Sequence, residues 1–424
     1  MALIRPFKGI RFNQSLVKNL GHVITPPYDV IDDAEQERLL QSSPYNIVRL
    51  EYGQTQPEDN ETENHYNRAA ETLMQWLKNG ILKPDNRNSY YLYEQSYIYN
   101  HQEFKRLGII AALKLEPYSD KIILRHERTM AGPKADRMKL LNSTRTNISP
   151  IFTLFPDPEN RISDFFALVD QNNPEIEFTG DFDQSHRLWS ITDPSIQEDL
   201  TTYLAPQPLL IADGHHRYET ALNFYKNSEQ NETPGAGYIL TIMSSLKDNG
   251  LRALPTHRLL RALSPGQKKN LHKMAEKQFK IIEWGNSHEM DRDKFLKDLA
   301  VVNHDKCGFG LITGEHASFL IPDNQSCLDA LPVSLLHENL LKPALALGVR
   351  KEIDKWMLSY PHSVNAAIDA VISGSADVAF ILETVSPSEV LECAQKDIVL
   401  PQKTTFFYPK LPSGLVLYNM DLSY

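Results

Sequence analysis

The chain has 424 residues, of which 41% are hydrophobic, so it can build a substantial core, and its length predicts two or three domains. Its 54 acidic residues outnumber 44 basic residues and give a formal net charge of −10, which argues against general nucleic-acid binding. The 3 cysteines lack CxxC spacing and no segment approaches the ~20 apolar residues of a membrane helix, so we expect a cytoplasmic protein with neither a disulfide framework nor a membrane partner.

The first third of the chain carries three local signals. Apolar and polar residues alternate around short turns up to about residue 50, which predicts mainly strands and loops. Residues 62–79 repeat apolar side chains at helical spacing and end at an Asn-Gly stop, so they predict a helix. Residues 89–99 and 104–115 are rich in aromatic and β-branched residues and meet at Asn100-His101, which predicts a β-hairpin.

A basic stretch follows at residues 125–145, in contrast to the acidic chain around it. It holds six cationic side chains, namely Arg125, Arg128, Lys134, Arg137, Lys139 and Arg145. A turn at residues 131–133 leads into a predicted helix over 134–143, so Lys134 and Arg137 would project from its first turn on neighbouring faces. This pattern predicts either an anion site at a helix start or a solvated basic helix face.

The central stretch of the chain is residues 208–222, which reads as strand, tight turn and helix. An apolar run ends at Asp213-Gly214, and His215, His216 and Arg217 occupy the first turn of the predicted helix. A helix start offers unpaired N–H groups and partial positive charge, so these residues would form a phosphate cradle. In the simpler alternative Asp213 only caps the helix.

The last part of the chain predicts a second domain. A turn over residues 254–260 would bring His257 and Arg258 toward the same phosphate site, and a lysine-rich helix begins near residue 264. We therefore expect domains at 1–263 and 264–424. The second domain should alternate strands at 309–313, 318–322 and 378–383 with helices at 333–347, 364–373 and 387–396. The predicted fold class is α/β, as a mixed α+β arrangement.

The string Asp213-Gly214-His215-His216-Arg217 resembles the signature of the ParB/sulfiredoxin superfamily, and most closely that of its free serine kinases. Along nearly its whole length the chain also resembles domain-of-unknown-function family 1015 (DUF1015). The phrases that carry this second resemblance are residues 24–31 (ITPPYDVI), 126–129 (HERT), 132–137 (GPKADR), 212–220 (ADGHHRYET), 254–258 (LPTHR) and 407–410 (FYPK). The first resemblance implies a ParB/sulfiredoxin-like core with large insertions in the first domain.

The ParB/sulfiredoxin superfamily includes sulfiredoxins, partition proteins and serine kinases, and the residues of this chain favour one of these activities over the others. Sulfiredoxins need a cysteine where His215 stands, and no cysteine precedes Cys307, so this chemistry is excluded. Partition proteins need basic DNA-binding helices, which this acidic chain does not show. Serine kinases combine the phosphate cradle with carboxylates, and here Asp213 and Glu127 could act as the base or as an Mg²⁺ ligand, with His216 as a further catalytic candidate. Glu127 could equally be a plain ion-pair partner.

The resemblance therefore implies a phosphotransferase that uses ADP or ATP, with Mg²⁺ as a further candidate cofactor, and a small hydroxyl substrate such as serine or phosphoserine. In this hypothesis the cofactor-binding residues are Gly214, His215, His216, Arg217, Arg128, Lys134, Arg137, His257 and Arg258. A phosphoserine phosphatase and a nucleotide-binding switch without catalysis stay open as alternatives. Lys403, Thr404 and Lys410 could form a separate substrate site in the second domain, and the oligomeric state stays open.

Overall fold

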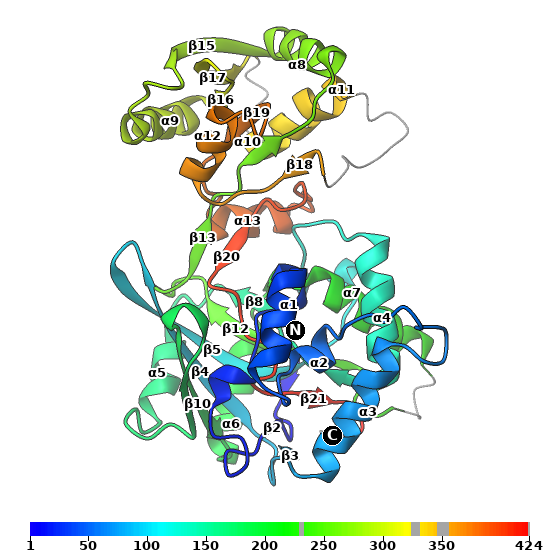
Figure 1. Ribbon diagram of the computed structural model, residues 1–424. Coiled ribbons are helices and arrows are strands. Elements are labelled where there is room, and N and C mark those ends of the chain that lie inside the picture. The colour runs from blue at the N-terminus through cyan, green and yellow to red at the C-terminus, as the bar shows by residue number, and fades with distance from the viewer. Residues whose placement is uncertain (229–232, 324–330, 346–355, 423–424) are drawn as a thin grey trace. The chain divides into compact units, whose positions relative to one another are not determined.

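The computed structural model describes residues 1–424 except 229–232, 324–330, 346–355 and 423–424 (Figure 1). The described chain forms two compact units. Unit 1 comprises residues 1–252, 394–397 and 407–424, and unit 2 comprises residues 253–393 and 398–406. The chain leaves unit 1 within β13 (Arg252–Leu254) and returns to it within β20 (Phe406–Tyr408). The C-terminal residues therefore belong to the same unit as the N-terminal ones.

Unit 1 is built around a nine-stranded mixed sheet in the order β6-β11-β8-β12-β5-β4-β10-β9, with β1 on β5. Its strands are β1 (Ile4–Arg5), β4 (Tyr90–Tyr99), β5 (Gln102–Lys114), β6 (Ile123–Leu124), β8 (Ile151–Phe155), β9 (Ile176–Thr179), β10 (Ser185–Ile191), β11 (Leu209–Asp213) and β12 (Tyr238–Ser245). β11 runs parallel to β6 and antiparallel to β8. Two small ladders join β2 (Ile10–Phe12) to β3 (Leu82–Pro84), and β7 (Thr146–Asn147) to β21 (Tyr418–Asn419).

Unit 1 also contains helices, and one of them, α7, follows the turn at Asp213-Gly214. They are α1 (Asp33–Ser42), α2 (Val48–Glu51), α3 (His65–Lys78), α4 (Ala131–Thr144), α5 (Arg161–Ala167), α6 (Pro194–Leu204) and α7 (His215–Asn227). α4 packs against both α3 and α7, so the basic stretch and the central motif lie side by side.

Several predictions for this unit are confirmed. The helix expected over 62–79 is α3, capped by Asn64. The hairpin is β4–β5, with positive φ at Asn100 and His101. The expectation of mainly strands and loops before residue 50 is wrong for α1, whose N-terminus is capped by Asp32 through the backbone N–H of Glu35 at 2.8 Å.

Unit 2 is a six-stranded antiparallel sheet in the order β15-β17-β16-β19-β14-β18. The strands are β14 (Arg258–Leu260), β15 (Phe279–Asn286), β16 (Phe309–Ile312), β17 (His316–Pro322), β18 (Leu358–Ser359) and β19 (Val378–Ile381). Every residue of β19 is buried, because Val378 and Phe380 join one hydrophobic core and Ala379 and Ile381 join the other. Helices therefore cover both faces of this sheet.

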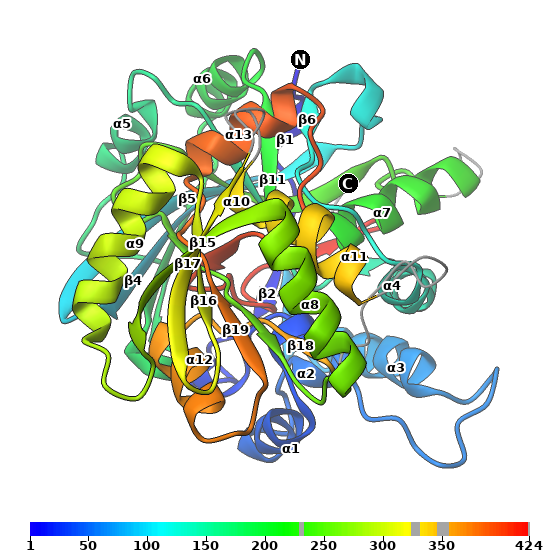
Figure 2. The same cartoon turned by 90° about the horizontal axis from the view of Figure 1, so that it is seen from above.

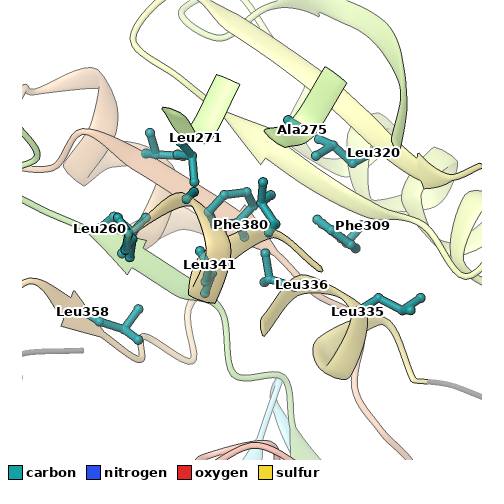
Figure 3. Packing of buried hydrophobic residues seen from close by; sticks show 14 of the residues in the cluster. Leu260, Leu271, Ala275, Phe309, Leu320, Leu335, Leu336, Leu341, Leu358 and Phe380 are labelled. Atoms are coloured by element: carbon teal, nitrogen blue, oxygen red, sulfur yellow. The ribbon is translucent and has the colours of Figure 1, made fainter. Parts of the chain in front are cut away.

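Figure 2 shows α8 (Pro265–Gln278) and α11 (Lys342–Ala344) on one side of this sheet and α9 (Arg292–Lys306) and α12 (Val364–Ile372) on the other. In the first core, Phe380 lies among Leu260 of β14, Leu271 of α8 and Leu341 (Figure 3). The helix predicted over 333–347 is divided in the structure into three consecutive segments, α10 (Pro332–Leu335), a π-helical segment (Leu336–Leu341) and α11. The last two residues of the predicted range lie outside the described chain. The remaining helix, α13 (Pro387–Gln395), lies where it was predicted.

Both units mix helices and strands, so the predicted α/β class is confirmed. Among the helices of the described residues, none has the length and apolar character needed to cross a membrane.

Candidate functional site

The predicted strand, turn and helix around the central motif are confirmed. β11 ends at Asp213, Gly214 has a φ of 95°, and α7 begins at His215. This left-handed conformation favours glycine, and a Cβ atom at Gly214 would lie 2.9 Å from Cγ2 of Ile151 and 3.2 Å from Nε of Arg217. Both the backbone and the close packing therefore require glycine at this turn.

Substitution Gly214→Ala is expected to destabilise the protein by about 1–2 kcal/mol, because it adds a side chain at positive φ and crowds Ile151. The measurement is the urea midpoint of unfolding. Gly132→Ala is the matched control, because Gly132 lies in α4 and a Cβ atom there meets nothing within 4 Å. Equal midpoints for the two variants would contradict the expectation.

Asp213 is held between two cations of unit 1. Its Oδ2 lies 3.1 Å from Nη2 of Arg217, and its Oδ1 lies 3.1 Å from Nζ of Lys410. Arg217 also donates from Nη1 to the carbonyl of Pro150. Lys410 was expected in a separate C-terminal site, but it belongs to unit 1 and contacts the central motif.

The two histidines of the motif use their Nε2 atoms as acceptors. His215 Nε2 accepts from the backbone N–H of His126 at 3.5 Å, and His216 Nε2 accepts from the backbone N–H of Met130 at 2.9 Å. Burial, above all, holds the pKa of His215 well below its usual range, so this ring is neutral near pH 7. These contacts tie the segment around residues 126–130 to α7, and direct phosphate binding by His215 and His216 stays a prediction.

His126 should make stability depend on pH. Burial lowers its pKa to about 4, only partly opposed by a hydrogen bond with the backbone of Ile211. The unfolded chain, with a histidine pKa of about 6.5, then binds the proton more readily than the folded chain.

Acidification from about pH 6.5 to about pH 4 should therefore cost up to about 3 kcal/mol of stability through His126. The measurement is the free energy of unfolding in urea across this range, compared with that of His126→Gln. Equal pH slopes for the wild type and the variant would show that His126 contributes nothing.

A small cavity of about 40 Å³ brings together two of the predicted phosphate-binding arginines, Arg137 of α4 and Arg217 of α7. It is also lined by Glu51, Ser149 and Thr220. Arg137 Nη1 donates to the backbone carbonyl of Glu51 at 2.9 Å, and its Nη2 lies 2.6 Å from Asp136. The helix–helix contact thus joins residues 80 positions apart in one site.

Glu51 is the carboxylate that the sequence did not reveal. Its side chain is only 2% exposed, accepts from Oγ of Ser149 at 2.8 Å and has Nη1 of Arg137 at 3.8 Å. Burial raises the pKa of Glu51, while Arg137 and Arg217 oppose the shift. A buried carboxyl with a raised pKa holds a proton more readily than an exposed one, which suits a group that must accept a proton as a general base.

The N-terminal family phrase at residues 24–31 contributes to the same site. The guanidinium carbon of Arg137 lies 4.0 Å from the ring centroid of Tyr28, which is a cation–π contact. Burial raises the pKa of Tyr28, and the nearby Arg217 and Arg137 oppose this effect. Asp29 also acts electrostatically on Glu51.

Lys134 of α4 lies against Glu219, which stands in α7 two residues after Arg217. Its Nζ is 3.0 Å from Glu219 Oε2, which also accepts from Oγ1 of Thr129 at 2.5 Å. Glu127 is half-buried and Arg128 is exposed, and neither lines the cavity of Arg137 and Arg217. Their proposed roles stay predictions.

His257 and Arg258 belong to unit 2, although the sequence assigned them to the first domain. Arg258 is fully buried and donates from Nε to His337 at 2.9 Å and from Nη2 to the carbonyl of Gln402 at 3.2 Å. His257 Nδ1 accepts from the backbone N–H of Leu382 at 3.2 Å. Their cofactor-binding role also stays a prediction.

Among the residues that the structure describes, no group of three or more His, Cys, Asp or Glu side chains could hold a metal ion. In phosphoryl-transfer sites, Mg²⁺ is often bound by one or two protein carboxylates together with the phosphates of the substrate. The protein would therefore supply one or two of the ligands, and the nucleotide phosphates would supply others.

Comparison with known proteins gives one family. The model of DUF1015, described as a protein of unknown function, matches residues 4–338. No curated protein matches the chain.

Three solved structures show distant likenesses to the chain. A conserved hypothetical protein from Pyrococcus furiosus is 15% identical with a TM-score of 0.40, covering 74% of this chain and 95% of that one. A free serine kinase in complex with AMP is 15% identical with a TM-score of 0.41, covering 74% and 92%. SbnI from Staphylococcus aureus is 10% identical with a TM-score of 0.37, covering 74% and 87%. Likenesses at these TM-scores carry no argument about activity.

Proposed function

The chain belongs to the DUF1015 family, and we propose that its unit 1 transfers a phosphoryl group between a nucleotide, ADP or ATP, and the hydroxyl of a small molecule such as serine. The observation that carries this proposal is the cavity where Arg137 and Arg217 meet the buried carboxyl of Glu51. The likeness of residues 213–217 to the motif of free serine kinases supports it, and the ParB/sulfiredoxin kinship of the core is part of the same proposal.

The charges suit phosphoryl transfer because most of its catalysis is positioning and neutralisation of charge. Arg137 contacts Asp136, and Arg217 contacts Asp213. A bound phosphate would share these guanidinium groups through charge-assisted hydrogen bonds. The start of α7 adds its partial positive charge beside Arg217.

In the proposed step, the substrate hydroxyl oxygen forms a bond to the terminal phosphorus of the nucleotide, and the bond from that phosphorus to the bridging oxygen breaks. The hydroxyl proton passes to the carboxylate of Glu51, and the leaving oxygen keeps the electron pair. Arg137 and Arg217 neutralise charge on the moving group. If Mg²⁺ accompanies the nucleotide, Asp213 is our candidate for its protein ligand.

Calorimetry with ADP, ATP, AMP, CTP and phosphoserine tests the binding part of the proposal. We expect binding of ADP or ATP that is dominated by the phosphates, so AMP should bind more weakly. If phosphoserine binds and is hydrolysed without any nucleotide, the phosphatase alternative is correct. If a nucleotide binds and changes the conformation without turnover, the protein is a switch.

A further inference from the structure

The segment Phe407–Lys410 lies over the large sheet of unit 1. The rings of Phe407 and Phe152 are 6.0 Å apart, and Lys410 Nζ contacts Asp213 Oδ1 at 3.1 Å. Lys410 is 14% exposed in its side chain. The carboxylate that contacts Arg217 through one oxygen thus contacts a lysine through the other, although this lysine lies 197 residues further along the chain.

Two residues of the β4–β5 hairpin hold the backbone of this segment. Arg106 Nη2 donates to the carbonyl of Pro409 at 2.8 Å and also to Oε1 of Gln95. Gln95 Nε2 in turn donates to the carbonyl of Lys410 at 3.2 Å and to Gln184 at 2.8 Å. Both carbonyl groups next to the Lys410 side chain are therefore fixed from the sheet.

Arg106 is an unusual group for a protein core. It is 1% exposed, its Nη1 has no hydrogen-bond partner among the described residues, and burial lowers its pKa. A buried charge without a paired carboxylate is costly, and an apolar residue of similar volume usually serves packing as well or better. Its hydrogen bonds to the Pro409 segment, together with the nearby charge of Asp213, suggest a role in the site.

We infer that Lys410 binds the terminal phosphate of the nucleotide, and that Arg106 is a positioning residue that acts through Lys410. This inference rests on the proposed function, and it adds Lys410 as a third cation to Arg137 and Arg217 in the proposed phosphate site. Asp213 contacts the ammonium group of Lys410, and a phosphate oxygen of the nucleotide would accept from one of the three N–H donors of that group. Arg106 and Gln95 keep the backbone of residues 409–410 in the place from which the lysine reaches the phosphate.

The first test is calorimetric titration of the full chain with ADP. Lys410→Met should weaken ADP binding by about 10- to 100-fold, because it removes a charge-assisted contact. Lys410→Arg should retain most of the affinity. Lys114→Met is the matched control, because Lys114 is also ion-paired, with Glu116 at 2.7 Å, and should leave the affinity unchanged.

The second test is a double-mutant cycle that separates positioning from a structural role. Arg106→Met should weaken ADP binding by roughly 3- to 10-fold in the wild-type background and have no further effect in the Lys410→Met background. Gln95→Glu supplies a second variant if Arg106→Met does not fold, because it pairs the buried guanidinium while removing the N–H donated to Lys410.

The outcomes distinguish the inference from the function on which it rests. If the wild type binds neither ADP nor inorganic phosphate, the proposed function fails. If the wild type binds ADP and Lys410→Met binds it equally well, only the role of Lys410 fails. If the effects of Arg106→Met and Lys410→Met add, Arg106 does not act through Lys410.

Discussion

Replacement of Glu51 by glutamine is expected to lower the turnover of phosphoryl transfer by about 10²- to 10⁴-fold, the usual contribution of a general base. The amide keeps an acceptor for Oγ of Ser149 but cannot take the substrate proton. Binding of ADP should change much less than turnover, so the loss should appear in kcat. The measurement is the steady-state rate of phosphorylated product formation at saturating nucleotide.

The pH dependence of turnover is a second test of the Glu51→Gln substitution. Burial raises the pKa of Glu51, and the base is active only when ionised, so the wild-type turnover should fall as the pH drops through this raised pKa. Glu51→Gln should lack this acid limb. Glu177→Gln, at an exposed glutamate that pairs with Arg187, is the control and should behave as the wild type. A wild-type rate in Glu51→Gln would exclude Glu51 as the base.

Arg217→Ala is expected to weaken ADP binding by about 1.5–3 kcal/mol, which corresponds to roughly 10- to 150-fold in Kd. Arg217 lines the cavity, contacts Asp213 and lies at the start of α7, so its guanidinium group is placed for a phosphate oxygen. Isothermal titration calorimetry provides the Kd.

Arg161→Ala is the control for this loss, because Arg161 lies in unit 1 and pairs with Asp199 on the surface. Arg217→Lys separates charge from geometry, and it should recover only part of the affinity because a lysine lacks the planar fork. An unchanged Kd in Arg217→Ala would show that Arg217 does not bind the nucleotide and has only a structural role, through its contacts with Asp213 and Pro150.

The elements that the sequence predicted well have strong local signals. The hairpin β4–β5 follows from its aromatic and β-branched strands and the Asn100-His101 turn, and α3 follows from its apolar periodicity. The strand, turn and helix of the central motif follow from an apolar run before Asp213-Gly214. α1 was missed, although Asp32 is a good N-cap, because the alternating pattern before it suggested strands.

The candidate site was predictable only in part, because its parts meet through long-range packing. Arg137 and Arg217 stood out by their local clusters of charge, and the contact of α4 with α7 brings them together. Glu51 did not stand out, since a single glutamate in a short phrase has no local feature that indicates burial. Lys410 was a candidate for a substrate site in the second domain, but its contact with Asp213 could not be predicted from the local sequence. The return of residues 407–424 to unit 1 likewise depends on contacts distant in sequence.

The most direct test of the proposed activity is phosphorus NMR of the purified protein with ATP or ADP and serine, and in a second sample with phosphoserine alone. We predict a new phosphate-ester resonance only when nucleotide and serine are both present, and we expect this resonance to be lost in Glu51→Gln. Release of inorganic phosphate from phosphoserine without nucleotide, or no change in any sample despite nucleotide binding, would contradict phosphoryl transfer to serine.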